Sequence, residues 1–142
     1  GFASGQSTKD SGKVYIHSGG TRTQGTIFDD QIPFLESMAE AAKSVVQYMN
    51  GGKNIAFINV LNRLSVDCDC DGNPHEPDMH DIGILASTDP LAIDQAAIDL
   101  VYAAKDSGSL IERIESRQGL HTLDYASEIG LGKRAYRLTE IR

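Results

Sequence analysis

The chain has 142 residues, of which 40% are hydrophobic and 23% are charged, and these fractions exclude a disordered chain. No apolar run approaches the roughly 20 residues of a membrane span, so we expect no membrane partner. The net charge of −7 argues against nucleic acid as a partner, because phosphate contacts need clustered lysine and arginine. The length suits one domain, and we expect residues 1–142 to form a single α/β domain.

The first half of the chain predicts a strand, a long helix and a second strand. Residues 13–17 (Lys-Val-Tyr-Ile-His) have the β-branched and aromatic content of a short strand. Apolar residues recur at helical spacing over residues 33–48, and an Asn-Gly-Gly sequence then ends that helix. The continuous apolar run at 54–61 is typical of a strand that is buried on both faces.

The second half predicts a strand, three helices and a closing strand. Residues 81–86 are expected to form a buried strand, which leads through an N-cap and a proline into a helix over 90–104. Two shorter helices are expected at 110–117 and 122–129, and a last strand at 135–141. This alternation indicates the α/β class, with a mixed or parallel sheet of about four strands flanked by helices.

The first residue of the chain and its two cysteines give expectations about missing sequence and about cellular location. The chain begins with Gly1 rather than methionine, and we expect it to be a piece of a longer protein that lacks its N-terminal part. Cys68 and Cys70 are too few and too closely spaced for a secreted disulfide scaffold. We therefore expect a reducing, cytoplasmic location.

Acidic residues are concentrated in one stretch. Between Leu64 and Ala104 there are nine acids and no lysine or arginine, whereas the rest of the chain has eleven acids and thirteen bases. Six of the nine acids fall within residues 67–81, together with both cysteines and two histidines. A run of acids is most often a solvated face, but this mixture of ligand types favours a functional segment.

An acidic Cys/His loop over residues 65–81 is the candidate site. An unstructured connection of this length is uncommon in a compact domain unless it is functional. Thiolates and imidazoles suit zinc or iron. The neighbouring acids disfavour a thiolate unless a cation binds, which argues against a cysteine nucleophile. We expect the metal ligands to come from Cys68, Cys70, Asp67, Asp71, His75, Asp78, His80 and His17.

Calcium is an alternative metal for the same loop. Its opening residues follow the Asp-x-Asp-x-Asp-Gly pattern of a calcium loop from Asp67 to Gly72, with Asp78 at the twelfth position. A proline at the eighth position, Asp in place of Glu at the twelfth, and a preceding strand argue against an EF-hand. Another use of the carboxylates for calcium stays open.

Several strings in the chain resemble domain-of-unknown-function family 362. They are Cys-Asp-Cys at 68–70, Pro-Asp at 77–78, Asp-Ile-Gly-Ile-Leu-Ala-Ser-Thr-Asp-Pro at 81–90 and Ala-Ile-Asp-Gln-Ala at 92–96. The tail is also similar, with Leu-Asp-Tyr-Ala at 123–126 and Glu-Ile-Gly-Leu-Gly at 128–132. The resemblance runs from about Phe34 to Ile141, includes His-Ser-Gly at 17–19, and identifies the chain with the C-terminal part of the family.

The resemblance implies a prokaryotic protein whose relatives are longer and largely uncharacterised. Many of them carry inserted ferredoxin-type segments and are described as iron–sulfur proteins. The two cysteines of this chain cannot supply the four thiolates of an ordinary cluster. A cluster would need non-cysteine ligands or ligands from outside the chain, such as a missing N-terminal half or a second subunit. A ferredoxin-like partner and a homodimer are therefore both open.

Two other functions compete with metal binding. One is a non-catalytic interaction or scaffold domain whose acidic loop docks a partner. The other is an enzyme whose substrate lies at Ser87, Thr88 and Asp89, because a helix N-terminus after a buried strand can bind an anion; helix capping is the simpler interpretation. No phosphate loop or Ser/His/Asp pattern identifies a reaction, so the sequence leaves open whether the domain is an enzyme.

Overall fold

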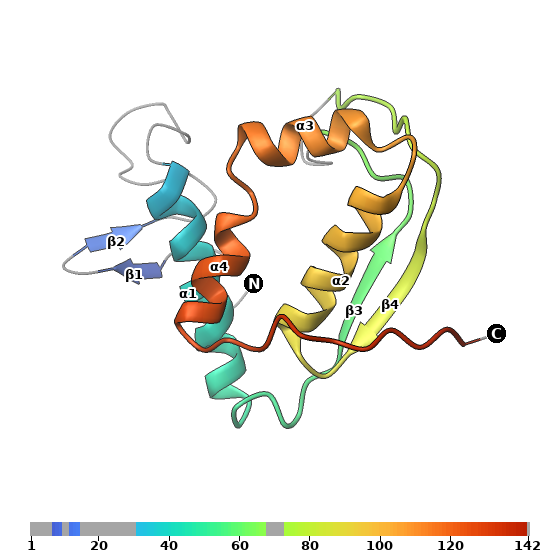
Figure 1. Ribbon diagram of the computed structural model, residues 1–142. Coiled ribbons are helices and arrows are strands. Elements are labelled where there is room, and N and C mark those ends of the chain that lie inside the picture. The colour runs from blue at the N-terminus through green and yellow to red at the C-terminus, as the bar shows by residue number, and fades with distance from the viewer. Residues whose placement is uncertain (1–6, 10–11, 15–30, 68–72, 142) are drawn as a thin grey trace.

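The computed structural model describes residues 7–9, 12–14, 31–67 and 73–141, and the fold is given for those residues. They form helices and strands in mixed order, which agrees with the α/β class (Figure 1). The elements are β1 (Ser7–Lys9), β2 (Gly12–Val14), α1 (Gln31–Tyr48), β3 (Phe57–Leu61), β4 (Gly83–Ser87), α2 (Pro90–Ala103), α3 (Gly108–Ser116) and α4 (His121–Glu128).

The strands form two separate antiparallel pairs. β1 pairs with β2, and β3 pairs with β4 so that Asn59 lies opposite Leu85. A parallel pair needs a crossover connection, usually a helix, and the described parts of the connection from β3 to β4 contain no helix. The expected mixed or parallel sheet of about four strands is therefore not found among the described residues.

The four described helices lie where the sequence predicts them, within three residues at either end. The strands agree less well. β3 is shorter than the predicted run at 54–61, β4 begins two residues later and ends one residue later than the predicted strand at 81–86, and β1 has no counterpart in the prediction. The strand expected at 13–17 overlaps β2 at Lys13 and Val14, and its other residues, including His17, lie outside the described residues.

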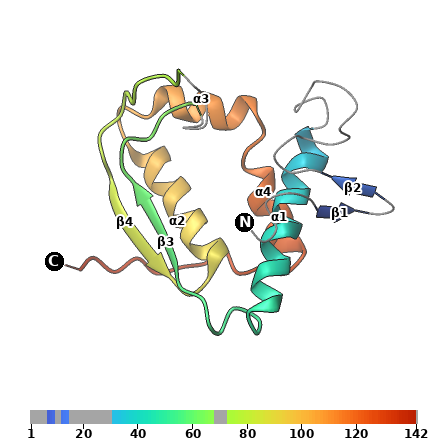
Figure 2. The same ribbon diagram turned by 180° about the vertical axis from the view of Figure 1, so that it is seen from behind.

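Helix α2 is the centre of the fold. It packs on one face of the β3–β4 pair and on α4 at its other side, and α1 lies beside α4 (Figures 1 and 2). Its mostly apolar sequence fits this position, because six of its side chains are buried. Leu91 packs with Leu123 toward α4, and Val101 packs with Leu61 toward the sheet.

Burial of the β3–β4 pair is one-sided. Leu61 is only 5% exposed where it faces α2, whereas Ile58 is 65% exposed and Val60 58% exposed on the opposite face. On β4, Ile84 is 71% exposed. The expectation that both strands are buried on both faces is wrong, because a single helix covers one face and no described element covers the other.

Asp89 forms the predicted N-cap of α2. Its Oδ1 accepts hydrogen bonds from the backbone N–H groups of Leu91 (2.9 Å) and Ala92 (3.0 Å), and its Oδ2 accepts one from Lys133 N–H (3.0 Å). A Cβ atom at Gly132 would lie 2.2 Å from Asp89 Oδ1, so only glycine lets the chain pass this close. The cap thus joins the start of α2 to the segment that follows α4.

That segment continues as an extended tail. Tyr136 donates a hydrogen bond to Asp99 on α2 at 2.7 Å, and the tail then passes the end of β4 and extends beyond it without pairing (Figure 1). The strand expected at 135–141 is therefore absent from this described part of the chain. Residues of the tail, of β4 and of α2 together line a hollow of about 690 Å³.

Among the helices of the described residues, none combines the length and apolarity that crossing a membrane requires.

Candidate functional site

The loop that contains the candidate site is tied at both ends by Asp81. Its Oδ1 accepts a hydrogen bond from the backbone N–H of Arg63 at 2.7 Å, and its Oδ2 accepts one from the side chain of Asn62 at 2.6 Å. The carboxylate therefore joins the exit of β3 to the approach of β4. Buried Met79, which is 7% exposed, fixes the loop to the body of the domain.

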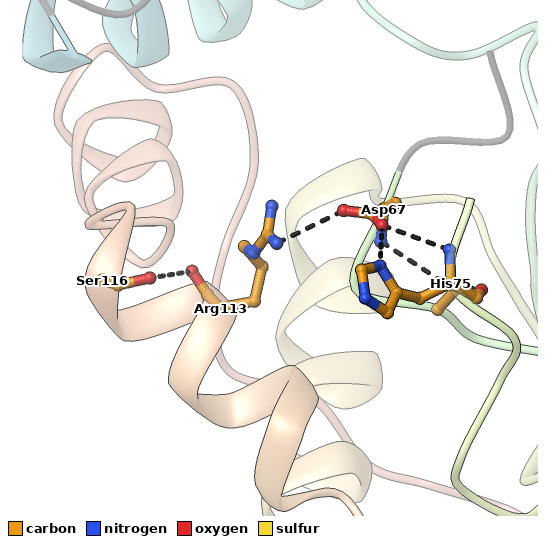
Figure 3. Close-up of polar contacts among 5 residues, drawn as sticks. Asp67, His75, Arg113 and Ser116 are labelled. Carbon is orange, nitrogen blue, oxygen red and sulfur yellow. Dashed lines mark hydrogen bonds and ion pairs between the residues drawn. The ribbon is translucent and has the colours of Figure 1, made fainter. Parts of the chain in front are cut away.

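Asp67 holds His75 and Arg113 together (Figure 3). Its Oδ2 accepts a hydrogen bond from the backbone N–H of His75 at 3.2 Å and also contacts the ring Nδ1 of the same residue. Its Oδ1 forms an ion pair with Arg113 of α3 at 3.2 Å. The Asp67 side chain is only 19% exposed, whereas that of His75 is 76% exposed, so a shielded carboxylate orients an accessible imidazole.

A second histidine of the loop is held in the same way. Asp106, in the turn after α2, accepts a hydrogen bond from the backbone N–H of His80 at 2.8 Å. The Nδ1 atom of His80 lies 2.8 Å from Oδ1 of the same carboxylate. In a neutral ring whose Nδ1 donates to a carboxylate, the lone pair stays on Nε2. In each case Nε2, rather than the Nδ1 that faces the aspartate, is the ring nitrogen whose lone pair could bind a metal or accept a hydrogen bond.

The two aspartates respond to these contacts. The pKa of Asp67 is lowered chiefly by the hydrogen bond from the His75 side chain, and the backbone N–H of His75 and the charge of Arg113 act in the same direction. The pKa of Asp106 is lowered chiefly by the hydrogen bond from the backbone N–H of His80. Both carboxylates are therefore held in the charged form, which suits an acceptor of imidazole N–H.

A hollow of about 550 Å³ lies between the loop and α3. His75 and Asp78 line it from the loop, and Arg113 and Ser109 line it from the helix. The hydroxyl of Ser109 is buried and has no hydrogen-bond partner among the described residues. Such a group is costly unless a water molecule satisfies it.

The structure brings together only some of the predicted ligands. Asp67 and His75 are in contact, and Asp78 lines the same hollow as His75, whereas His80 is paired with Asp106 instead. Over residues 31–67 and 73–141, no three His, Cys, Asp or Glu side chains are grouped so as to hold a metal. The other predicted ligands lie outside the described residues: Cys68, Cys70, Asp71 and His17.

Two residues of the site are missing from the sequence-based prediction. Arg113 is 46 positions from Asp67, and Asp106 is 26 positions from His80. No motif links residues at these separations, because the contacts arise only when α2 and α3 pack beside the loop. Asp106 lies two residues beyond Ala104, where the acid-rich stretch ends, so that stretch did not point to it.

The alternative site at Ser87, Thr88 and Asp89 is not open to an anion. The carboxylate of Asp89 already accepts from the first free N–H groups of α2, and the tail passes over it. A negative side chain at this position would repel an anionic substrate. The simpler interpretation, helix capping, is therefore confirmed.

These observations define the class of the protein as an α/β domain with a polar loop packed on a helix. The family model described as "Domain of unknown function (DUF362)" matches residues 4–99, which is well over half of the chain. The chain therefore belongs to the DUF362 family. No curated protein and no solved structure matches it.

The matched range differs from the resemblance read from the sequence. It begins before Phe34 and ends at Asp99, so it includes the whole of the 65–81 loop, β3, β4 and most of α2. The similar strings of the tail, at 123–132, lie beyond it. The family match thus covers the loop of the candidate site but neither Asp106 nor Arg113, which hold its residues from outside the loop.

Proposed function

We propose that this DUF362 domain binds one zinc or iron ion through the 65–81 loop. The observation that carries the proposal is the way in which both loop histidines are held. Each is bound twice by one aspartate, through the backbone N–H and through Nδ1. Metal-ligating histidines commonly donate their second ring N–H to a carboxylate, which fixes the ring and raises the basicity of the ligating nitrogen.

The proposed roles follow from which atoms are already engaged. Both oxygens of Asp67 have partners, so we assign Asp67 to orient His75 rather than to bind the metal. The Nε2 atom of His75 and the thiolates of Cys68 and Cys70 are the proposed ligands. Soft thiolate and imidazole donors suit zinc or iron better than calcium. Asp78, Asp71, His80 and His17 are candidates for the remaining position.

The metal would serve as a Lewis acid or as a structural cross-link of the loop, since both are compatible with a tetrahedral site. Two cysteines favour a single ion over an iron–sulfur cluster. Thiolate ligands also need a reducing compartment, which supports a cytoplasmic location for the domain.

The test is a zinc titration of the chain under reducing conditions against a competing chromophoric chelator. We expect the wild type to bind one zinc ion, and we expect Cys68→Ser and His75→Ala to weaken binding at least about 100-fold, because each removes a ligand. Glu76→Gln is the matched control. It removes a carboxylate of the same loop whose side chain is 90% exposed and forms an ion pair with Arg63.

Equal zinc affinity in the wild type and in Cys68→Ser would contradict the proposal, as would an equal loss in Glu76→Gln. A general acidic surface, unlike a built site, gives weak binding that every removed carboxylate reduces alike.

A docking surface is the second candidate function. It is favoured by the long stretch from Leu64 to Ala104, which has nine acids and no base, and by the exposure of Asp81 and Asp99 within it. A basic or ferredoxin-like partner would fit such a surface. Partner binding that falls steeply with salt, together with no stoichiometric metal, would favour docking over the metal site.

A further inference from the structure

The face of the β3–β4 pair that points away from α2 is apolar and exposed. Cross-strand neighbours on this face are Val60 with Ile84 and Ile58 with Ala86. The three larger side chains are 58–71% exposed. No described element lies over this face in either view (Figures 1 and 2). A two-stranded pair is marginal in water without burial of its apolar surface, so this face lacks the cover that it needs.

The apolar surface continues around β4 to the tail. Ile84 and the tail line the same hollow, whose floor is formed by Ala92, Ala96 and other apolar residues of α2. Along the tail, Tyr136 is 41% exposed, Leu138 is 53% exposed and Ile141 is 93% exposed. Scattered apolar residues are normal on a protein surface, but a contiguous patch marks an interaction site.

The size of this patch suits a second copy of the chain. At about 100 Å² of apolar surface per side chain, six side chains that are on average somewhat more than half exposed offer on the order of 400 Å². Each partner of a standard interface buries about 800 Å², of which about 65% is apolar in homodimers. The six residues thus supply most of the apolar area that a dimer needs: Ile58, Val60, Ile84, Tyr136, Leu138 and Ile141.

Charge also permits this contact, although the chain as a whole carries −7. The exposed face of β3 and β4 has no charged residue, and Asp94 bonds Asn59 on the α2 side. Two copies that meet through this face would therefore bring two uncharged strand faces together, not like charges.

We propose that two copies of this chain associate through the outer face of β3–β4 and the adjoining tail. The interface is isologous, so the same residues contribute from each copy. This inference uses none of the residues of the proposed metal site, and either can fail without the other.

The test is the mass of the chain in solution across a dilution series, measured by sedimentation equilibrium. We expect a reversible dimer for the wild type, and we expect Ile84→Lys to raise the dimer dissociation constant at least about tenfold by placing two like charges at the axis-related patch. Ile58→Lys, on the other strand, should have the same effect. Met38→Lys is the control, because Met38 is 39% exposed on α1, away from the patch.

Charge complementation gives a second readout. An equimolar mixture of Ile84→Lys and Ile84→Glu should associate more tightly than either variant alone, because opposite charges then replace like charges in the interface. Circular dichroism must show that each variant has wild-type helix content. A wild type that is monomeric up to about 1 mM, where even the weakest standard interfaces associate, would overturn the proposal. So would a dimer that Ile84→Lys and Ile58→Lys leave intact, because another surface would then form it.

Discussion

At the scale of single residues, the same hydrogen-bonding arrangement occurs twice in the candidate site. A carboxylate takes both the backbone N–H and Nδ1 of a histidine, once at Asp67 with His75 and once at Asp106 with His80. The first aspartate is in the loop, and the second comes from the far end of α2. The aspartates thereby define which ring nitrogen faces outward, and they do so without needing to touch a metal themselves.

Replacing Asp67 should reveal this positioning role. In Asp67→Asn the carboxylate that orients His75 is lost while the proposed ligands remain, and loss of such outer partners typically weakens metal binding about 10–100-fold. The change should therefore lower zinc affinity less than removal of His75 does. A chelator competition compares Asp67→Asn, Asp67→Glu, His75→Ala and Glu76→Gln. A loss in Asp67→Asn as large as in His75→Ala, with no recovery in Asp67→Glu, would mark Asp67 as a ligand instead.

Asp89 is the residue on which the start of α2 depends. Asp89→Ala removes two hydrogen bonds to the first turn and one to Lys133, so we expect the free energy of unfolding to fall by about 1–3 kcal/mol. Asp89→Asn should retain part of this stability. The measurement is urea unfolding, with Thr88→Ala as the exposed neighbouring control. Equal stability of Asp89→Ala and the wild type would contradict the role of the cap.

Asp94 gives a pH-dependent prediction. Burial raises the pKa of its carboxyl, and a hydrogen bond from Asn59 lowers it by less. An acid whose folded-state pKa is raised takes up its proton more readily when folded, so its charge destabilises the fold at neutral pH and this penalty disappears as the pH falls through the raised pKa. Asp94→Asn should therefore raise the melting temperature at pH 7 and have little effect near pH 3. A lower melting temperature at pH 7 would contradict this.

At the scale of elements, the sequence predicts the helices well and the sheet poorly. The helix at 90–104 carried both a cap and a proline at its first position, and these local signals set the start of α2 at Pro90. For β3, a continuous apolar run cannot distinguish a strand buried on both faces from one whose second face is uncovered. Ile58 and Val60 are apolar in either case, and only the packing of α2 decides which side is buried.

The tail also shows that a sequence pattern does not determine whether a segment pairs as a strand. Residues 135–141 have the composition of a strand, yet a strand exists only where a neighbour accepts its hydrogen bonds. Tyr136 is fixed to Asp99 on α2, and residues 135–141 form no strand. Pairing depends on how the tail lies against β4, which the amino-acid composition of the tail does not determine.

The sequence predicted which segment contains the candidate site, but not which side chains contact one another there. The density of Asp, His and Cys at 65–81 indicated the loop, and the structure does place Asp67 beside His75. The partners from outside the loop, Arg113 and Asp106, depend on how α2 and α3 turn back over it. The spacing of residues along the chain carries no information about such contacts.

At the scale of the whole molecule, the domain has two distinct surfaces that are built from different residues. The polar loop, with its hollow against α3, is the proposed metal site, and the outer face of β3–β4 is the proposed contact between copies. The match to the DUF362 family covers the loop and both of these strands. Whether the family shares each property can be examined separately, because the two sets of residues do not overlap.

The central claim is that the 65–81 loop binds a metal. The most direct measurement is the metal content per chain, by elemental mass spectrometry, of protein purified without oxygen, beside Cys68→Ser and Glu76→Gln prepared in the same way. The account predicts close to one zinc or iron per chain in the wild type and in Glu76→Gln, and very little in Cys68→Ser. No metal in the wild type, or the same metal content in all three proteins, would contradict it.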